Sequence, residues 1–496
     1  MTRHQRLTLV AAIVGSAVAT IDGSIVNVAL PAIQEDLGGG LSAQQWVSNA
    51  YLLTLGSLIL IGGSVGDIYG ERRVFTIGLG AFGVFSVACA LSPTIEVLIG
   101  ARALQGAAAA LMVPSSLAII VAAFEPTERG AAVGSWTAWG GIAAIVGPLA
   151  GGVIVDQASW RWIFALNVPL VLGTQALVLA AVPVTPRTTG RRVDFLGAAL
   201  CAAGLAGIVF ALIEQPPYGW SSPVIVVPLC AGLVAFGAFL GYERRVAEPM
   251  LELRLFSRRN FAVGNAETLS MYAGLAILFF FLTIFLQQVA GYSALESGLT
   301  IVPVTLVMFA LSKRFGALAD RFGPRVFMGA GPLIASIGIL LLLRTGLETD
   351  YVTDLLPALL VFSLGLSLTV APLVATVLAD ADESDAGIAS AINNAIARVA
   401  GLVGVSVVGV VVSSTLVGDT FAANDDSVKA FHQAVVICAI LVAAGGVLGA
   451  IGIVNPRRTV GASKCPGGQL VGTPRGAVEL ASPALGRTVE PTPQEA

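Results

Sequence analysis

The stretch GGSVGDIYGERR, residues 62–73, decides how this chain is organised, because it separates two long apolar runs with glycines, one aspartate and an arginine pair. Of the 496 residues, 56% are hydrophobic and 11% are charged, and the mean hydropathy is +0.87. Soluble domains carry about 25% charged residues. We therefore interpret the bilayer as the solvent of this chain, and the stretch as a turn between two membrane spans.

The same stretch contains a pattern that is also found in enzymes. Its first five residues, GGSVG, match the G-x-S-x-G turn that exposes the nucleophilic serine of hydrolases. Ser64 would need a histidine base, but the two histidines are His4 near the N-terminus and His432 far away. The five cysteines include no close pair, and no lysine follows a glycine. We therefore expect no enzyme, no cofactor, no metal and no nucleic-acid partner.

The hydrophobicity pattern predicts an all-α integral membrane protein with fourteen transmembrane helices. The first apolar run continues to Leu30, which is longer than a signal peptide requires and predicts an uncleaved span. The segment 455–496 is rich in Pro, Gly, Ser and Thr and predicts a disordered tail. The predicted spans are 7–30, 46–66, 74–92, 97–122, 132–155, 162–183, 195–214, 223–242, 261–286, 298–316, 326–344, 355–378, 391–416 and 431–454.

The lysines and arginines predict the orientation of these spans, because cytoplasmic loops are enriched in both. With a cytoplasmic N-terminus, 22 of the 27 fall in cytoplasmic segments. Only Arg161, Arg344 and Lys429 fall in outer loops, and only Arg102 and Arg398 fall within spans. An even number of spans returns the chain to its starting side. We therefore predict that both termini are cytoplasmic.

The turn occurs twice in the chain. GSVGDIYGER (63–72) aligns with GALADRFGPR (316–325), 253 positions later. Two repeated halves are typical of transporters, which rock them about a central site. Glycine permits a tight turn, and an aspartate at a helix end can contact the next helix N-terminus or an arginine. We interpret the turns as a cytoplasmic gate whose residues are Gly63, Asp67, Gly70, Arg72, Arg73, Asp320 and Arg325.

Three ionisable residues within spans are candidates for proton or substrate coupling, because such residues are costly in a membrane and usually functional. Asp22 lies in the span 7–30 and Arg102 in the span 97–122, both in the outer half, so a direct or water-mediated pair is one possibility. Glu267 lies in the first third of its span, nearer the cytoplasm. A structural role for each of the three is the alternative interpretation.

The first turn completes the signature G-x-x-x-D-x-x-G-x-[RK]-[RK] of the major facilitator superfamily, which the chain resembles. Its fourteen spans resemble the fourteen-helix drug:proton antiporter branch of that superfamily. Three further stretches are similar to motifs of this branch: DGSIVNVALP (22–31), RALQG (102–106) and SWRWIFALNVP (159–169). The resemblance covers about residues 5–455.

GPLAGG (147–152) resembles the fifth-helix motif of the antiporters through Gly147, Pro148, Gly151 and Gly152. The longer form of that motif prefers glycine where Ala143 stands, so the match is incomplete. Small residues at this spacing let helices approach closely, and a proline permits bending.

The resemblance implies two pseudo-symmetric six-helix bundles, 1–184 and 261–454. It also implies two inserted helices with cytoplasmic linkers in 185–260, followed by the tail 455–496. It further implies a multi-pass protein of the bacterial inner membrane. We expect a monomer whose partners are a small-molecule substrate, protons and lipid. The implied function is the export of a lipophilic drug or metabolite in exchange for protons, by alternating access.

Two other functions remain open at this point. A proton-coupled importer or a facilitator of a small nutrient would use the same two halves, although the GPLAGG motif disfavours it. A membrane receptor or assembly scaffold could use the 42-residue tail to bind a partner.

Overall fold

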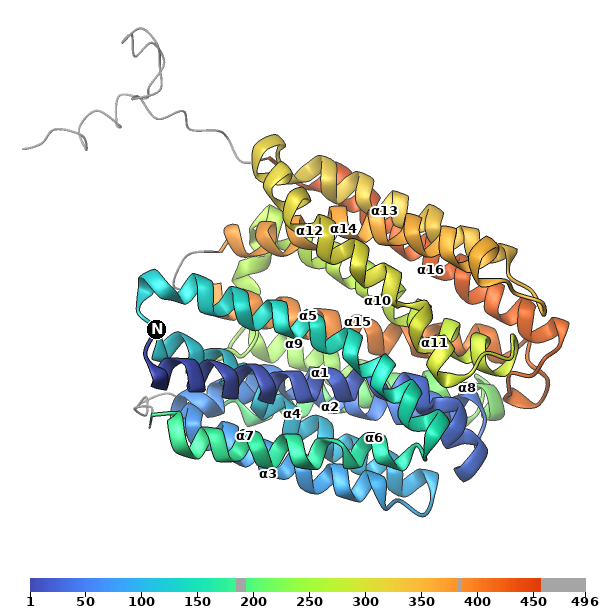
Figure 1. Ribbon diagram of the computed structural model, residues 1–496, viewed down its shortest axis with the longest axis horizontal. Helices are drawn as coiled ribbons and strands as arrows, with labels where there is room; N and C mark the ends of the chain where they lie inside the picture. Colours follow the sequence, from blue (N-terminus) through green and yellow to red (C-terminus); the bar gives the residue numbers. More distant parts are fainter. Residues whose placement is uncertain (184–192, 382–385, 456–496) are drawn as a thin grey trace, which may run out of the picture. The chain divides into compact units, whose positions relative to one another are not determined.

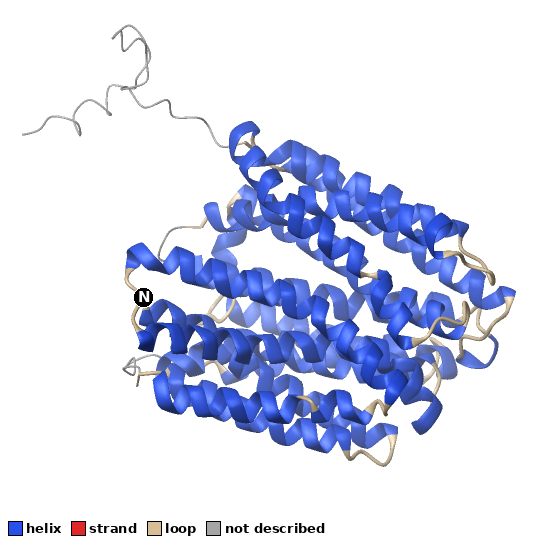
Figure 2. Ribbon diagram, in the orientation of Figure 1, coloured by secondary structure: helices blue, strands red, loops and turns tan. Residues whose placement is uncertain are grey.

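The structure, a computed structural model, describes residues 1–183, 193–381 and 386–455. Figure 2 shows these ranges as helices joined by short loops, and no strand occurs in them. The helices are α1 (Arg3–Leu37), α2 (Leu41–Tyr69), α3 (Glu71–Ala90), α4 (Ile95–Ala123), α5 (Pro126–Gln157), α6 (Arg161–Ala165), α7 (Asn167–Ala181), α8 (Phe195–Tyr218), α9 (Pro223–Glu243), α10 (Arg259–Gln288), α11 (Ala294–Thr300), α12 (Val302–Phe322), α13 (Pro324–Leu341), α14 (Leu356–Ala379), α15 (Ala386–Ser413) and α16 (Asp425–Gly452).

Fourteen helical segments of the described chain are long and apolar enough to cross a membrane, which confirms the predicted number. The pairs α6–α7 and α11–α12 each form one span, Arg161–Ala181 and Ala294–Phe322. Helices suit this solvent because every backbone polar group inside them is satisfied within the segment. The predicted tail falls almost wholly outside the described residues.

Two sets of helices repeat one packing pattern within the unit Met1–Val454 (Figure 1). In the first set, α4 packs on α2 and α3, α1 packs on α5 and α7, and α3 packs on α7. In the second set, α14 packs on α12 and α13, α10 packs on α15 and α16, and α13 packs on α16. The correspondence gives the two pseudo-symmetric halves that the fold prediction requires. The exact residue boundaries of the halves remain predictions.

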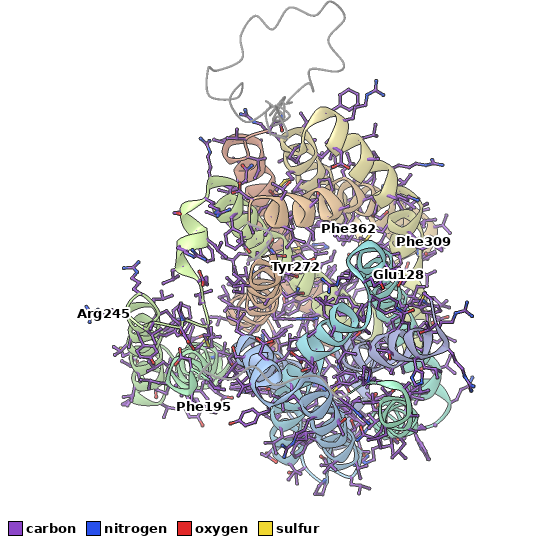
Figure 3. All side chains as sticks on the ribbon, turned by 90° about the vertical axis from the view of Figure 1, so that its left-hand side faces the viewer. Glu128, Phe195, Arg245, Tyr272, Phe309 and Phe362 are labelled. Carbon is purple, nitrogen blue, oxygen red and sulfur yellow. The ribbon has the colours of Figure 1, made fainter. Side chains whose placement is uncertain are left out.

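The pair α8–α9 lies beside these halves. Helix α8 contacts α2 of the first half and α15 of the second, whereas α9 packs mainly on α8. The indole Nε1 of Trp46 in α2 donates a 2.7 Å hydrogen bond to Glu214 in α8. Figure 3 is a view along the helix axes. In it the pair α8–α9, marked by the labels Phe195 and Arg245, lies at the edge of the helix bundle. An inserted helix pair therefore covers one flank of the junction between the halves.

The repeated turn has the same geometry in both halves. Gly70 has φ +95° and its N–H donates to the carbonyl of Gly66, while Gly323 has φ +93° and donates to that of Ala319. Side chains rarely adopt this positive φ, so glycine is required at both positions. The sequence repeat is therefore also a structural repeat.

The arginine that follows each glycine repeats its contact as well. Arg72 donates a 3.0 Å hydrogen bond to the carbonyl of Leu179, near the end of α7. Arg325 donates a 2.6 Å hydrogen bond to the carbonyl of Ala450, near the end of α16. Cations stabilise helix C-termini, where carbonyls lack intrahelical partners. Each turn thus fastens the start of one helix to the end of the last helix of its own half.

We expect Gly70→Leu to destabilise the protein by about 1–3 kcal/mol, the usual cost of forcing a side chain into such a backbone conformation. The melting temperature of the purified protein measures this effect. Gly80→Leu is the matched control, since Gly80 lies within α3 with no atom near its missing side chain. Equal melting temperatures for the two variants would show that the turn does not need glycine.

Candidate functional site

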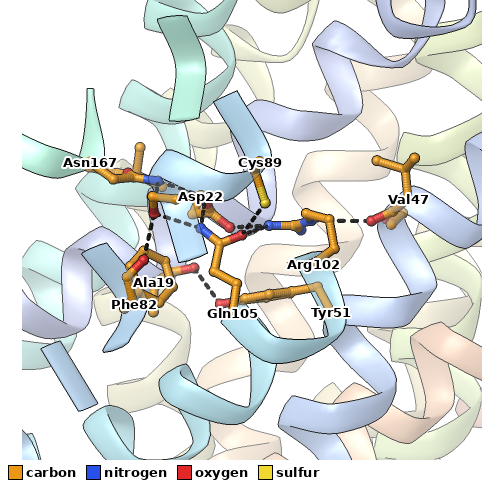
Figure 4. Close-up of polar contacts among 12 residues, drawn as sticks. Ala19, Asp22, Val47, Tyr51, Phe82, Cys89, Arg102, Gln105 and Asn167 are labelled. Atoms are coloured by element: carbon orange, nitrogen blue, oxygen red, sulfur yellow. Dashed lines mark hydrogen bonds and ion pairs between the residues drawn. The ribbon is translucent and has the colours of Figure 1, made fainter. Parts of the chain in front are cut away.

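The candidate site is a cluster of buried polar side chains in the first half (Figure 4). Helix α1 supplies Asp22, α4 supplies Arg102 and Gln105, and α7 supplies Asn167. All four are buried, with at most 1% of each exposed. Arg102 and Gln105 are three residues apart and therefore lie on one face of α4. The predicted pair of Asp22 and Arg102 is thus brought together, as a direct contact.

The carboxylate of Asp22 is hydrogen-bonded through both oxygens. Oδ2 accepts from Nη1 of Arg102 at 2.5 Å. Oδ1 accepts from Nε2 of Gln105 at 2.9 Å and from Nδ2 of Asn167 at 2.8 Å. Three donors therefore surround the carboxyl group of Asp22, and both of its oxygens have hydrogen-bond partners.

The guanidinium of Arg102 is held from several directions. Its Nη1 also donates to Oε1 of Gln105 at 2.7 Å, and its Nε donates to the carbonyl of Val47 at 3.2 Å. The ring of Tyr51 lies 4.3 Å from the guanidinium carbon, which is a cation–π contact. The pair of opposite charges is neutral overall, so it can persist in the membrane interior. Removal of one partner would leave the other charge buried and uncompensated.

Several members of the cluster were not predicted as site residues. Asn167, Ser86 and Tyr51 are neutral, and the search for ionisable residues within spans passes over them. Gln105 had two signals, its place in the RALQG stretch and the helix face that it shares with Arg102. A search for amides and hydroxyls in apolar spans would have found Asn167 and Ser86, the latter accepting from Gln105 at 2.9 Å.

The GPLAGG motif in α5 lies where the two halves meet. Gly147 and Gly151 lie against Ser24 and Ile25 of α1, with no room for a side chain. Gly152 lies against the backbone of Ala294 and Leu295, and Gly298 of α11 lies against the carbonyl of Pro148. One face of the motif therefore packs within its own half, and the adjacent face packs on the other half.

The halves are joined on the side where α1 ends, which we term the opposite side; the side where α1 begins is the N-terminal side. Asp156, which closely follows the motif, accepts from the backbone N–H groups of Ala294 and Leu295 at 3.0 and 2.9 Å. Further hydrogen bonds between the halves join Gln45 to Val405, Asn49 to Ser406, Gln287 to Val28 and Gln288 to Gln34. The opposite side is therefore closed.

The flank formed by α5 and α12 is separated on the N-terminal side. A Cβ added at Gly130, Gly134 or Gly141 of α5 would have no neighbouring atom within 4 Å, unlike one at Gly152 near the other end. Phe309 of α12 is 77% exposed. Figure 1 shows these two helices close together at α11 and diverging toward the N-terminal side. The structure thus has one closed side and one side with an open flank.

The remaining predicted residues lie outside the cluster. The gate residues lie at the two turns on the N-terminal side, where Asp67 is half-buried and Asp320 and Arg73 are exposed. Glu267 is buried in α10 of the second half, so it does not join Asp22 and Arg102. The described ranges contain no group of three or more His, Cys, Asp or Glu side chains that could hold a metal ion.

Two repeated halves, fourteen spans and a buried ion pair define a secondary-transporter architecture. A family model described as Major Facilitator Superfamily matches residues 12–405. The chain therefore belongs to the Major Facilitator Superfamily, a class of membrane transporters, and is a multi-pass membrane protein. This confirms the resemblance that the turn and its repeat indicated.

Relatives with known names are similar over most of the chain. The puromycin resistance protein pur8 of Streptomyces alboniger is 36% identical, over 81% of this chain and 81% of the relative. The multidrug resistance protein Stp of Mycobacterium tuberculosis is 33% identical, over 93% of this chain and 86% of the relative. A bacterial homologue of the human lysosomal transporter Spinster, solved in an inward-facing conformation, has a TM-score of 0.64 at 14% identity and covers 91% of this chain and 97% of that chain. The last similarity concerns the fold alone.

Proposed function

We propose that this protein is a drug efflux transporter of the bacterial inner membrane that exports a lipophilic organic compound in exchange for protons, acting as a monomer. The observation that carries the proton coupling is the Asp22–Arg102 pair, a titratable carboxyl group in the core of the first half. The names of the relatives, which include resistance proteins for puromycin and for multiple drugs, support export and the substrate class.

Proton binding at Asp22 has a direct electrostatic consequence. A proton on this carboxyl group removes the negative charge that Arg102, Gln105 and Asn167 surround. Arg102 then becomes a buried charge without its counter-ion, which is an unfavourable state. The protonated protein is therefore driven toward another arrangement of the cluster. This is the property that a coupling site needs: two protonation states that favour two conformations.

The conformation described here fits one step of such a cycle. With cytoplasmic termini, the open flank faces the cytoplasm and the closed side faces outward. In this step the transporter has released its proton to the cytoplasm and can receive substrate from the same side. A gradient of 100 mV and one pH unit supplies about 2.3 and 1.4 kcal/mol per proton, enough for accumulation of roughly several-hundred-fold.

Inverted membrane vesicles test the proposal. We expect vesicles that contain the protein to accumulate Nile red or ethidium when their lumen is made acidic, and to release protons as dye enters. Vesicles without the protein are the control. Dye uptake driven by the reverse pH gradient would instead indicate an importer. Dye uptake that does not depend on the pH gradient would indicate a facilitator. If deletion of 456–496 abolished function while the membrane level stayed unchanged, a scaffold role would gain support.

We also propose that the repeated turns gate the N-terminal side. Asp67→Asn is expected to slow dye transport several-fold while dye affinity stays within a few-fold, because a gate changes conformational exchange and not the binding site. Initial rates over a range of dye concentrations separate the two effects. Asp320→Asn tests the second turn, and normal rates in both variants would remove the gate hypothesis. Arg72 and Arg73 also anchor the topology, so variants of them need a check of membrane insertion first.

A further inference from the structure

One carboxyl group in the second half has surroundings opposite to those of Asp22. Glu267 lies in the first third of α10 and is 0% exposed. Among the residues that the structure describes, no donor forms a hydrogen bond to its Oε1 or its Oε2. Asp22, by comparison, accepts from Arg102, Gln105 and Asn167. Asp22 in the first half is thus fully hydrogen-bonded, whereas both carboxyl oxygens of Glu267 in the second half are buried without a hydrogen bond.

The space for Glu267 is made by glycines of α16. A side chain at Gly449 would begin 2.7 Å from Oε2 of Glu267, and one at Gly445 would begin 3.7 Å from its Cγ. The missing Cβ at Gly449 also lies 2.5 Å from the carbonyl oxygen of Met328 in α13. The carboxyl group therefore lies in a narrow space between α10, α16 and α13. A carbonyl oxygen close by can accept a hydrogen bond from a protonated carboxyl group but cannot stabilise a negative charge.

The nearest arginines on these helices are engaged elsewhere. Nε of Arg259 donates to the carbonyl of Gly452 at 2.8 Å, and Nε of Arg325 donates to that of Ala450 at 2.6 Å. Both contacts are made at the last turn of α16, on the N-terminal side. Arg398 of α15 lies against Gly56 of α2, at the junction of the halves. None of the three forms an ion pair with Glu267.

The other charged groups near the start of α10 also have their own contacts. Arg258 donates to the carbonyl of Asp380, whose carboxylate accepts from the N–H of Phe261. The charged residues of α16 lie in its first turns, at the opposite end of that helix from Gly449. On α10 itself, Nδ2 of Asn265 donates to the carbonyl of Phe261 and the hydroxyl of Thr268 donates to that of Gly264, so neither bond goes to Glu267. Glu267 is therefore not part of the hydrogen-bond network in this region.

An ionised carboxylate without a partner in such a space is strongly disfavoured, because burial removes its hydration and nothing replaces it. The neutral acid avoids this cost, and its O–H group can donate a hydrogen bond to a nearby carbonyl oxygen. We propose that Glu267 is a second proton-binding site of the transport cycle and that it holds a proton in this conformation. The role in the cycle rests on the proposed function, whereas the bound proton follows from the geometry alone.

Glu267 then holds its proton in the conformation in which the flank between α5 and α12 is open. Because α16 contacts both α10 and α13, a movement of α16 would widen the space around Glu267 and admit water to it. Water at this carboxyl group would favour release of the proton. The second half would then titrate in its own conformational step.

Infrared spectroscopy of the full-length protein in lipid vesicles tests the bound proton without any transport assay. A free glutamate titrates near about 4.3, so an accessible Glu267 would be ionised at about pH 8. We expect the wild-type minus Glu267→Gln spectrum at that pH to contain the C=O stretch of a protonated carboxylic acid. The corresponding spectrum for Asp22→Asn should show a carboxylate band instead. If the Glu267→Gln difference shows only a carboxylate band, the proton-binding site does not exist.

Transport measurements test the role in the cycle. We expect Glu267→Gln to shift the pH dependence of dye efflux and to reduce the number of protons released per dye molecule. Ser270→Ala is the matched control, since Ser270 is one turn further along α10 and bonds to the carbonyl of Leu441. If the Glu267→Gln variant keeps the wild-type pH profile and the wild-type number of protons per dye molecule, Glu267 has no role in the transport cycle. Failure of the wild type to couple dye to protons would overturn the proposed function and leave the infrared result standing.

Discussion

Asp22→Asn is expected to abolish proton-driven accumulation of dye, down to the level of vesicles that lack the protein. The asparagine side chain cannot bind and release a proton near neutral pH. The imposed pH gradient can therefore no longer change the charge of the cluster. Binding of a neutral dye should persist, because the change removes a charge and not the space between the halves. Dye uptake and proton release, measured together in inverted vesicles, report both parts of this expectation. Asp22→Glu keeps the titratable group and should retain partial activity.

The hydrogen bonds of Asp22 show why a second variant is needed as a control for folding. An asparagine has one acceptor oxygen, so its NH2 group would face either Arg102 or the amides of Gln105 and Asn167. Arg102 would also keep a buried charge without a partner, at a cost of about 3–5 kcal/mol. Asp22→Asn/Arg102→Gln removes both charges and should recover much of this stability.

The pair of variants separates coupling from folding. We expect the double variant to reach the membrane at a higher level than the single variant and to remain unable to build a gradient. Wild-type uptake and wild-type proton release in either variant would show that Asp22 is not the coupling residue. Glu267 would then be the remaining buried carboxyl candidate.

The fold was predictable because its main signals are local. Spans follow from runs of apolar residues, and the two halves follow from one turn that recurs 253 positions later. Gly70 and Gly323 preserve that turn since their positive φ excludes other residues. Arg72 and Arg325 repeat because each meets the carbonyls at the end of a neighbouring helix. The apolar runs and the turn glycines act within a few residues and are therefore visible in the sequence, whereas the partners of the two arginines lie 107 and 125 positions away.

The contacts of the candidate site were only partly predictable because they are not local. Asn167 bonds to Asp22 across 145 positions, and Gln45 bonds to the carbonyl of Val405 across 360. Asn167 lies in the SWRWIFALNVP stretch, but nothing in that stretch indicates its contact with Asp22, and Gln45 belongs to none of the quoted motifs. Ionisable residues were found because their cost in a membrane makes them rare. Neutral polar residues carry a weaker signal, and their partners depend on the packing of whole helices.

One helix links the ion pair to the junction of the halves. Asp22 lies on α1, and the next turn of that helix presents Ser24 and Ile25 to Gly147 and Gly151 of α5. The adjacent face of α5 then packs on α11 through Gly152. We infer that a change in the charge of Asp22 reaches the closed side through this short series of contacts. Closely packed helices suit this role, because tightly packed contacts transmit a shift.

Gly152→Val is expected to open the closed side and to reduce transport by at least about tenfold. A side chain at this position would begin 2.5 Å from Cα of Leu295 and 2.8 Å from the carbonyl oxygen of Ala294. Both are backbone atoms, so α5 and α11 must move apart. Overpacking of this kind costs about 1–3 kcal/mol, which shifts a conformational equilibrium by roughly 5–150-fold. The variant should therefore populate the conformation in which these helices are separated.

Spin labels at Leu91 and Val417, which are exposed and lie in different halves, measure this shift as an increase in their distance. Gly141→Val is the matched control on the same helix, because no atom lies within 4 Å of its missing side chain. We expect the control to keep the wild-type distance distribution and most of the transport rate. If Gly152→Val also keeps both, the contact between α5 and α11 does not hold the opposite side closed, and the GPLAGG motif acts only within its own half. If the distance grows while transport persists, closure of this side is not a step that limits the cycle.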